Sequence, residues 1–312
     1  MAINRPFVQD PVLTAIAVAY KNQAFIADSV MPRRPVSSNL FRYNTFAFGQ
    51  QITPIDTRVG RLAGPNKTEF SSDRQTAETE DYGLDIPIPN DDRRAAQGTG
   101  VDVDGMAAEF ASELVAIGRE QRVSNIVFSA ATYPVGNKVT LSGTSQWSDF
   151  TNSDPLTAIL NAMDAMVMMP TDLVLGRLVM TKLSTHPKLV KAMHGNDGDS
   201  GVITPQFLAN LLGIKRVHVG SAWVNTAAKG QAVSRARLWG KHAALLTLDV
   251  QAAPQNMRTS FGYTAQWGDK VSGRIVDPNM GLRGGVNIRV GEQLREVVIA
   301  SDLGYFFENA IA

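Results

Sequence analysis

The side chains of this sequence that could do acid–base or metal chemistry do not stand in the spacing of a recognisable site. Its four histidines are His186, His194, His218 and His242, and none stands in the His-Glu-x-x-His spacing that puts two metal ligands on one helix face. The chain has no cysteine, which excludes disulfides, thiolate nucleophiles and cysteine-bound zinc or iron–sulfur centres. We therefore expect no metal site built on these residue types.

Other short motifs that resemble ligand sites are each incomplete. The stretch GLRGGVN lacks the Lys-Ser or Lys-Thr ending that grips a nucleotide phosphate. Two aspartate pairs, Asp102 with Asp104 and Asp197 with Asp199, lack the third ligand and the bidentate glutamate of a calcium loop, so capping and turn roles are expected. The serines of SGTSQWS show no nucleophile-elbow pattern. The sequence thus predicts no catalytic residue, no cofactor and no enzyme.

Charge is balanced over the whole chain. Lys and Arg number 30 and Asp and Glu 29, so the net charge of +1 provides no overall field for nucleic acid or an anionic membrane. Short basic pairs occur at Arg33–Arg34, Arg93–Arg94 and Lys215–Arg216. Such pairs can touch phosphate weakly without reading a base sequence. We favour the alternative, in which they lie on solvated faces or form ion pairs between subunits.

The length and composition suit a globular protein. With 312 residues, of which 44% are hydrophobic, the chain can build one large domain or two modest ones. Its first residues, MAINRPFVQDPVLTAIAVAYKNQ, lack a basic segment followed by an unbroken apolar stretch, so no signal peptide is predicted. Nowhere do about 18 apolar residues run together, and no membrane helix is expected. The expected compartment is the cytoplasm of a producing cell.

Residues 1–42 are predicted to form an N-terminal arm. A short helical patch, Val12–Tyr20, precedes the stretch DSVMPRRPVSSN. Pro32 and Pro35 fix their own backbone and move the preceding residues away from helix, so this stretch should be extended. An arm with so little core of its own is either a floppy terminus or lies along another subunit, and we favour the second.

Residues 43–92 are predicted to form an extended loop built as a β-hairpin. The aromatic stretch LFRYNTFAF at its start predicts a strand with one sheltered face. Residues 49–82 are mostly polar, with the turn signal LAGPNK near the middle. A two-stranded ribbon alone is only marginally stable in water. This one therefore either lies on a partner surface or is disordered.

A long helix is predicted over about residues 103–129. Asp102 or Asp104 can cap its start, and apolar residues then recur at three- and four-residue spacing. The expected buried stripe consists of Met106, Phe110, Leu114 and Ile117. Charged residues fall mostly on the other faces, at Glu109, Glu113, Arg119, Glu120 and Arg122. A helix of this length suits a spine against which other elements are laid.

Residues 151–250 alternate between helix and strand patterns, which predicts an α/β insert. Ser153 or Asp154 before Pro155 starts one helix, and Gly213 closes another, QFLANLL. A further helix is expected at STHPKLVKAM, a mobile loop at NDGDSG, and strands at DLVLGRLVMT, IKRVHVG and RLWGKHAALLTLDV. After the insert, strands are expected at SFGYTAQW, GVNIRVG and QLREVVIA, and a final short helix at SDLGYFFENAI. The elements together predict an α+β fold.

The order of these elements, together with several stretches, resembles the tailed-bacteriophage major capsid protein family. The stretches are VGRLAGPNKTEF in the extended loop, IPNDDRRAA before the long helix, QWSDFTNSDP before the insert, and SFGYTAQWGD and LGYFFENAI near the end. The resemblance covers essentially the whole chain. It is specific as an ordered set, whereas no single stretch is diagnostic.

The resemblance implies a domain organisation. In this family the extended loop lies on a neighbouring subunit. Residues 93–150 and 251–312 would form the peripheral domain around the spine helix, and residues 151–250 the axial domain. Subunits would assemble as pentamers and hexamers into an icosahedral head that encloses double-stranded DNA, in the virion and first in the host bacterial cytoplasm.

The resemblance also implies partners. The principal partner is the chain itself. A portal, a separate scaffolding protein or decoration proteins, and packaged DNA held by weak non-specific contact are expected, and no membrane. The arm begins within a few residues of Met1, which favours separate scaffolding or none. Lys67 lies near the loop tip, where some members form a Lys–Asn cross-link, but no partner can be named and no cross-link is expected.

Charged residues of the arm, the extended loop and the segment before the long helix are the candidates for contacts between subunits. They are Arg33, Arg34, Arg58, Arg61, Lys67, Glu69, Arg74, Glu78, Arg93 and Arg94. Two alternatives stay open. An encapsulin-like compartment shell shares the fold but encloses protein cargo, and an unrecognised hydrolase or transferase with a disordered loop would be a soluble monomer with turnover.

Overall fold

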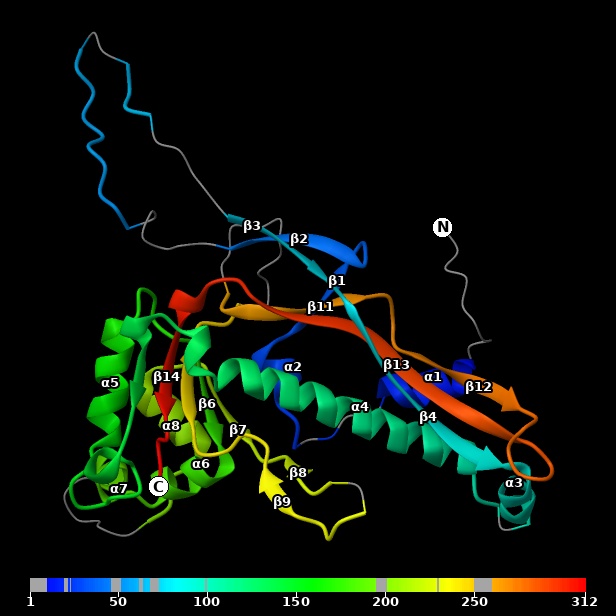
Figure 1. Ribbon diagram of the computed structural model, residues 1–312. Coiled ribbons are helices and arrows are strands. Elements are labelled where there is room, and N and C mark those ends of the chain that lie inside the picture. Colours follow the sequence, from blue (N-terminus) through cyan, green and yellow to red (C-terminus); the bar gives the residue numbers. More distant parts are fainter. Residues whose placement is uncertain are drawn as a thin grey trace.

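The computed structural model describes residues 10–19, 22, 24–45, 52–61, 64–67, 73–98, 100–194, 201–228, 230–249 and 260–312. Figure 1 shows two parts side by side. The α/β part lies around strand β6 (Asp172–Gly176), and the long-sheet part lies around strand β13 (Gly285–Val298). The predicted mobile loop NDGDSG falls at residues 196–201, almost entirely outside the described residues.

The long-sheet part contains a five-stranded sheet in the order β1-β11-β13-β12, with β4 also paired to β13. The other strands are β1 (Arg33–Val36), β4 (Glu80–Pro89), β11 (Gly262–Trp267) and β12 (Val271–Asp277). Strand β13 holds this sheet together, because it pairs antiparallel with β4, β11 and β12. The two strands predicted at GVNIRVG and QLREVVIA are therefore one continuous strand.

Helices cover this sheet and its ends. They are α1 (Pro11–Ala19), α2 (Ala27–Val30), α3 (Asn90–Gln97) and α4 (Val103–Val127). The predicted long helix is α4, and its start is capped by Asp102, whose carboxylate accepts a hydrogen bond from Gly105 N at 3.1 Å. Figure 1 shows α4 running beneath β13 and β4, where it also contacts α1. None of the helices described is both long and apolar enough to cross a membrane.

The face of α4 that the sequence predicted to be buried is largely exposed. Met106, Phe110 and Leu114 are 61%, 55% and 38% exposed. The buried face instead carries small side chains that pack against the sheet, namely Ala107, Ala108 and Ala111. Short side chains let the helix axis approach the sheet closely, which turns the large apolar side chains outward. Arg119 and Glu120, expected on polar faces, are buried as well.

The α/β part is a second five-stranded sheet, in the order β5-β14-β10-β6-β7. Its other strands are β5 (Lys138–Thr140), β7 (Arg216–Gly220), β10 (Ala243–Leu246) and β14 (Gly304–Glu308). Its helices are α5 (Pro155–Ala165), α6 (Arg177–Ser184), α7 (Pro187–His194) and α8 (Pro205–Leu212). A small hairpin of β8 (Trp223–Asn225) and β9 (Arg235–Arg237) projects below α4 in Figure 1. Gly213, with φ at 68°, ends α8 as predicted.

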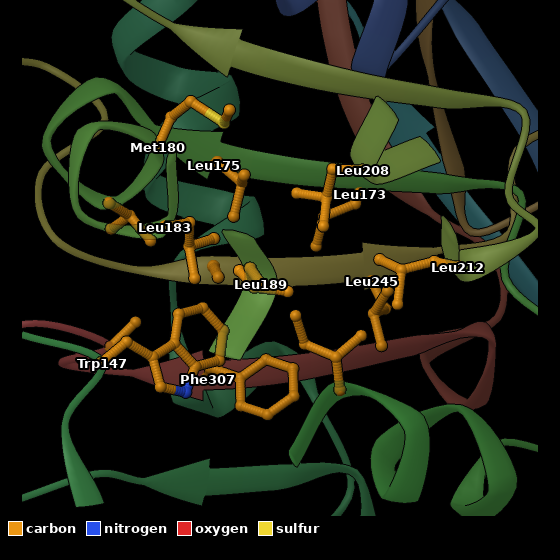
Figure 2. Packing of buried hydrophobic residues seen from close by; sticks show 14 of the residues in the cluster. Trp147, Leu173, Leu175, Met180, Leu183, Leu189, Leu208, Leu212, Leu245 and Phe307 are labelled. Carbon is orange, nitrogen blue, oxygen red and sulfur yellow. The ribbon is translucent and has the colours of Figure 1, made fainter. Parts of the chain in front are cut away.

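A large apolar core fills the α/β part. Figure 2 shows its side chains converging from the helices and from the strands, among them Trp147, Leu173, Leu175, Leu245 and Phe307. The Trp147 and Phe307 rings lie 5.1 Å apart. Strands β6 and β10 are buried along their whole length, as expected for central strands covered on both faces.

Two secondary-structure predictions in and after the insert were wrong. The predicted C-terminal helix SDLGYFFENAI is a single 3-10 turn, Ser301–Leu303, followed by β14. The alternation of a strand sends Phe306 and Phe307 into two different apolar clusters, which one helix face could not do. The second half of DLVLGRLVMT is α6 instead of strand, because Val179, Met180 and Leu183 are buried at helical spacing.

The expected domain boundaries also differ from the pairing of the strands. Strands β5 and β14 lie in stretches assigned from the sequence to the part with the long helix, but both belong to the sheet of the α/β part. The C-terminal segment therefore crosses from one sheet to the other directly after β13. Local sequence patterns could not predict the place of β5 and β14, because their pairing joins residues far apart in the chain.

The extended loop begins as a paired ribbon. Strand β2 (Leu40–Thr45) pairs antiparallel with β3 (Asp73–Glu78), and β4 then continues along β13. Short 3-10 turns elsewhere are Ala130–Thr132, Val135–Asn137 and Gly143–Ser145. Residues 52–61 are exposed without exception and carry no regular secondary structure. Figure 1 shows this segment reaching well beyond both sheets.

Candidate functional site

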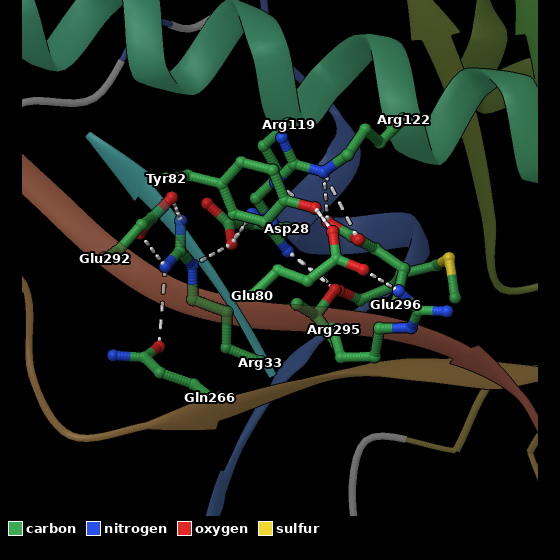
Figure 3. A network of polar contacts seen from close by, with 12 residues as sticks. Asp28, Arg33, Glu80, Tyr82, Arg119, Arg122, Gln266, Glu292, Arg295 and Glu296 are labelled. Carbon is green, nitrogen blue, oxygen red and sulfur yellow. Dashed lines mark hydrogen bonds and ion pairs between the residues drawn. The ribbon is translucent and has the colours of Figure 1, made fainter. Parts of the chain in front are cut away.

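Two groups of charged side chains hold the roots of the arm and of the extended loop on α4 and β13 (Figure 3). At the root of the arm, Arg33 Nε donates to Asp28 at 2.8 Å, and its other nitrogens bind Glu292 of β13. Arg119 of α4 binds Asp28 from the opposite side. The arm is thus joined to both the helix and the sheet by one chain of ion pairs.

The two ends of this ion-pair chain are shielded from water, whereas its middle is open. The side chains of Glu292 and Arg119 are only 1% and 3% exposed, but that of Asp28 is 66% exposed. Burial alone would raise the pKa of Asp28, but the neighbouring Arg119 and Arg33 outweigh it and lower that pKa. Arg119 also donates to the Met31 carbonyl at 3.0 Å and to Thr264 Oγ1 at 3.1 Å. Arg119 therefore binds both the arm, through Asp28 and Met31, and the sheet, through Thr264.

Glu120 forms the deepest contact in the same region. Its carboxylate accepts hydrogen bonds from Ile26 N and Ala27 N, both at 2.8 Å, and from Trp239 Nε1 at 2.6 Å. Burial raises the pKa of Glu120, outweighing these three hydrogen bonds. The donors come from the arm and from the α/β part. One side chain of α4 therefore links three regions of the chain.

The root of the extended loop is held in a similar way. Arg122 of α4 lies over the ring of Tyr82 on β4, with 3.5 Å between the guanidinium carbon and the ring centroid. The same guanidinium donates to Glu296 at 3.2 Å, and the Tyr82 hydroxyl donates to Glu80 at 2.6 Å. Burial and the Glu80 carboxylate raise the pKa of Tyr82 to about 12. Figure 3 shows Arg295 closing the group on Glu80.

Three arginines among the predicted contact residues bind groups of other elements in their own chain. Besides Arg33, Arg34 donates to the Asp249 carbonyl at 3.0 Å and lies over the ring of Tyr263. Arg93 binds Asp104 of α4 at 2.8 Å. These arginines stabilise the subunit itself, so a contact with a neighbour would have to share them.

The remaining predicted contact residues, apart from one, are exposed. They are Arg58, Arg61, Lys67, Arg74, Glu78 and Arg94. Glu78 accepts a hydrogen bond from Asn39 at 2.9 Å, and Arg94 lies 3.9 Å from Asp91. Glu69 falls outside the described residues. No single site gathers these side chains, because they follow the length of the loop and of α3.

The polar groups that come closest to a catalytic arrangement serve the structure. His186 Nε2 lies 3.1 Å from Ser153 Oγ, but that hydroxyl donates to the Asp149 carbonyl at 2.6 Å and both residues are buried. Asp172 binds His218 and Arg216, each at 2.8 Å, at the start of β6. Among the described residues there is no group of three or more His, Asp or Glu that could hold a metal ion.

The sequence interpretation did not find the buried charges of Arg119, Glu120 and Glu292. A usable signal was present in the long helix, where Arg119 and Glu120 stand side by side between apolar positions. Opposite charges inside an apolar pattern are rare unless they are paired. Glu292 carries no such signal, because its partner Arg33 is 259 positions away.

The subunit thus carries an arm and a loop that leave its body and are tied to α4 and β13 by ion pairs and hydrogen bonds. Over 98% of its length the fold matches a phage-related protein of Bordetella bronchiseptica, with a TM-score of 0.75, 23% identity and 99% of that chain covered. It also matches a virus-like particle from Pyrococcus furiosus, with a TM-score of 0.55, 12% identity and 95% and 96% of the two chains covered. No family model matches the sequence.

Relatives of known function identify the family. The major capsid protein of Pseudomonas phage JBD67 is 48% identical over 309 residues, which cover 99% of both chains. The major capsid protein of Burkholderia phage BcepMu is 25% identical over 316 residues, 97% of this chain and 96% of that one. The chain belongs to the phage major capsid protein family, and its function is structural. The resemblance seen in the sequence is confirmed.

Proposed function

We propose that this chain assembles with copies of itself, as pentamers and hexamers, into an icosahedral phage head that encloses double-stranded DNA. The observation that carries the proposal is the extended loop. Its root is fixed on α4 and β13 through Tyr82 and Glu80, whereas residues 52–61 are exposed throughout and include three aliphatic side chains. Ordering such a segment costs conformational entropy that its own chain does not offset. A neighbouring subunit would supply the missing contacts.

The two parts of the subunit would then have different places in the shell. We assign the long-sheet part to the peripheral domain, with α4 as its spine, and the α/β part to the axial domain around each capsomer axis. The pairing of β5 and β14 extends the axial domain beyond residues 151–250, to about residues 138–140 and 304–308. The arm, residues 1–42, would remain with the peripheral domain, because its root binds α4 and β13.

Further partners follow from the same assignment. A portal and either separate scaffolding or decoration proteins would complete the head. Packaged DNA would be held by weak phosphate contacts, for which the exposed arginines are suited. The head would assemble in the cytoplasm of the host bacterium, without a membrane partner and without catalysis by this chain.

Deleting residues 56–74 tests the proposed role of the extended loop. The deletion takes only the first two residues of β3 (Asp73–Glu78) and leaves α4, β4 and β13 intact, so the subunit should keep its circular dichroism spectrum and melting temperature. Electron microscopy should then find no closed shells, whereas the full chain forms them. Normal shells from the deleted protein would refute the role of the loop. Shells that contain protein cargo instead of DNA would favour a compartment over a phage head.

A further inference from the structure

The balanced net charge of the chain conceals an uneven distribution of charge. Residues 200–248 contain six Lys and Arg but no Asp or Glu, so all 29 acidic residues of the chain lie outside them. This segment runs from α8 through β7 and the hairpin of β8 and β9 to β10, all in the α/β part. A stretch with a single sign of charge produces a local positive potential that the net charge of +1 does not reveal.

The hairpin of β8 and β9 carries two of these cations on one face. Arg235 and Arg237 are two positions apart on β9, and Trp223 pairs directly with Arg237. Side chains at such positions of an antiparallel pair point to the same side. The guanidinium carbon of Arg237 lies 3.8 Å from the centroid of the Trp223 ring, and Trp223 is still 52% exposed. The face therefore presents two guanidinium groups beside an accessible indole ring.

Two more cations lie at the root of this hairpin. Lys241 is in the turn that joins β9 to β10. Gly176 N donates to the His242 carbonyl at 3.3 Å, which places the next residue, Arg177, beside the same turn. Lys241 and Arg177 are both exposed, and Figure 1 shows the hairpin projecting clear of both sheets. The hairpin cations are thus Arg177, Arg235, Arg237 and Lys241.

No carboxylate of the same chain neutralises the hairpin cations. In the part of the chain that the structure describes, none of the four forms an ion pair, and Nε of Arg237 is buried without a hydrogen-bond partner. The long-sheet part differs, because Arg122, Arg274 and Arg295 each bind a carboxylate there. Cations held together without counter-charge repel one another, which destabilises the compact state. The missing negative charge would come from outside the subunit.

A surface with one sign of charge suits a polymer of the opposite sign better than a protein. Contacts between proteins pair positive with negative groups, which fixes their register, whereas duplex DNA presents one phosphate charge per about 1.7 Å of its axis. The tip of the hairpin adds Gln231 and Ser234, exposed side chains of the kind that bind phosphate. We propose that the hairpin cations bind the phosphate backbone of packaged double-stranded DNA without reading its sequence. This rests on the proposed enclosure of DNA and names the surface that contacts it.

Radical oxidation of intact heads tests this contact, because DNA-filled and emptied heads share the same contacts between subunits. Trp223 should be oxidised several-fold less in filled than in emptied heads, as measured by mass spectrometry of its peptide. Trp239 is fully buried, and Leu282 is 95% exposed on the turn between β12 and β13, so neither should change. Equal oxidation of Trp223 in both kinds of head would overturn the proposal. Equal protection of Leu282 would do the same, since DNA would then shield the whole subunit.

Substitution of the hairpin cations gives a second readout on the unassembled subunit. Arg235→Gln with Lys241→Gln removes two exposed cations that have no ion pair, so the melting temperature should stay unchanged. Binding of a fluorescently labelled duplex is followed by anisotropy at several salt concentrations. The slope of log Kd against log salt should be smaller by about 1.8, at about 0.9 for each lost phosphate contact.

The matched control is Arg58→Gln with Arg61→Gln, which removes the same charge from the extended loop and should leave this slope unchanged. Equal changes in the two variants would mean that charge binds DNA diffusely, and would overturn the assignment to the hairpin. An unchanged slope in the hairpin variant, with heads of the unaltered chain still filled, would overturn this surface alone. Heads of the unaltered chain that hold no DNA would instead contradict the proposed function itself.

Discussion

Different interactions stabilise the α/β part and the long-sheet part of this subunit. In the α/β part, β6 and β10 are buried over their whole length and the helices close an apolar core around them. In the long-sheet part the apolar layer between α4 and the sheet is thin and rich in alanine. Beside it lie the buried charges of Arg119, Glu120 and Glu292.

The difference matches what each part has to do. An apolar core is non-directional, and in the α/β part it surrounds the two central strands β6 and β10. The long-sheet part anchors an arm and a loop that leave the body, and ion pairs with hydrogen bonds fix such segments in direction. The same part leaves two large apolar side chains, Met106 and Phe110, exposed on the outside of α4.

The largest effect is expected in the apolar core of the α/β part. Leu173→Ala should lower the free energy of unfolding by about 4 kcal/mol, because the fully buried side chain leaves a cavity that the central strand cannot close. Denaturant titration followed by circular dichroism measures the loss. Leu178→Ala, on the exposed face of α6, is the matched control and should change stability by less than about 0.5 kcal/mol. Equal losses would show that the apolar core is not what stabilises this part.

Breaking the ion-pair chain at the root of the arm should have the next largest effect. Arg33→Ala should cost about 3 kcal/mol, since Glu292 would remain buried without its partner while the half-buried arginine site is partly screened. The double variant Arg33→Met with Glu292→Leu should recover most of the loss, because it leaves no buried charge. The measurement is again the free energy of unfolding. A double variant no more stable than Arg33→Ala would contradict this explanation.

Two carboxyls, Glu120 of the long-sheet part and Asp172 of the α/β part, should respond to acid in opposite directions. Burial raises the pKa of Glu120, so the carboxyl binds its proton more readily in the folded than in the unfolded chain, and its contribution to stability grows as the pH falls toward 4.5. Burial would also raise the pKa of Asp172, but hydrogen bonds from His218, Thr171 and Arg216 outweigh it and lower that pKa. The contribution of Asp172 is therefore complete above pH 3.8 and is lost as the pH falls further.

Unfolding free energies measured against pH for the unaltered chain, Glu120→Gln and Asp172→Asn test this contrast. The stability difference between the unaltered chain and Glu120→Gln should widen toward acid pH, and the difference for Asp172→Asn should narrow. Parallel curves for the two variants would show that the two carboxyls share one kind of environment.

The smallest effect is expected for an ion pair on the surface of the long-sheet part. Arg283 lies 3.1 Å from Asp91, with both side chains 57% exposed. Arg283→Ala should therefore change the free energy of unfolding by about 0.5 kcal/mol or less, and less still in high salt. A loss as large as that of Arg33→Ala would mean that exposure does not separate the two kinds of ion pair.

Much of the fold follows from local patterns in the sequence. Asp102 and Asp154 mark the starts of α4 and α5, and Gly213 ends α8, because caps depend only on residues within one turn. The elements that the sequence predicted wrongly are those that depend on pairing with residues far away in the chain. The C-terminal helix became β14 because its pairing strands, β10 and β5, lie more than 50 residues earlier in the chain.

The candidate contact residues divide in the same way. Charged residues of the arm, the loop and the segment before α4 stay predicted contacts between subunits, but the sequence did not predict that Arg33, Arg34 and Arg93 have partners in their own chain. The stripe on α4 is the clearest case. Its period was evident from sequence, but two faces of the helix fit the pattern, one with small and one with large apolar side chains.

The sequence by itself determined the caps of α4, α5 and α8, the absence of thiol chemistry and the polar character of residues 49–82, since these depend on residue type and on neighbours within a few positions. Only the tertiary structure decided which face of α4 meets the sheet, which charges are buried and which strands share a sheet. Those choices depend on the shape and charge of surfaces brought together from distant parts of the chain, where close packing selects one arrangement among several that the local pattern allows.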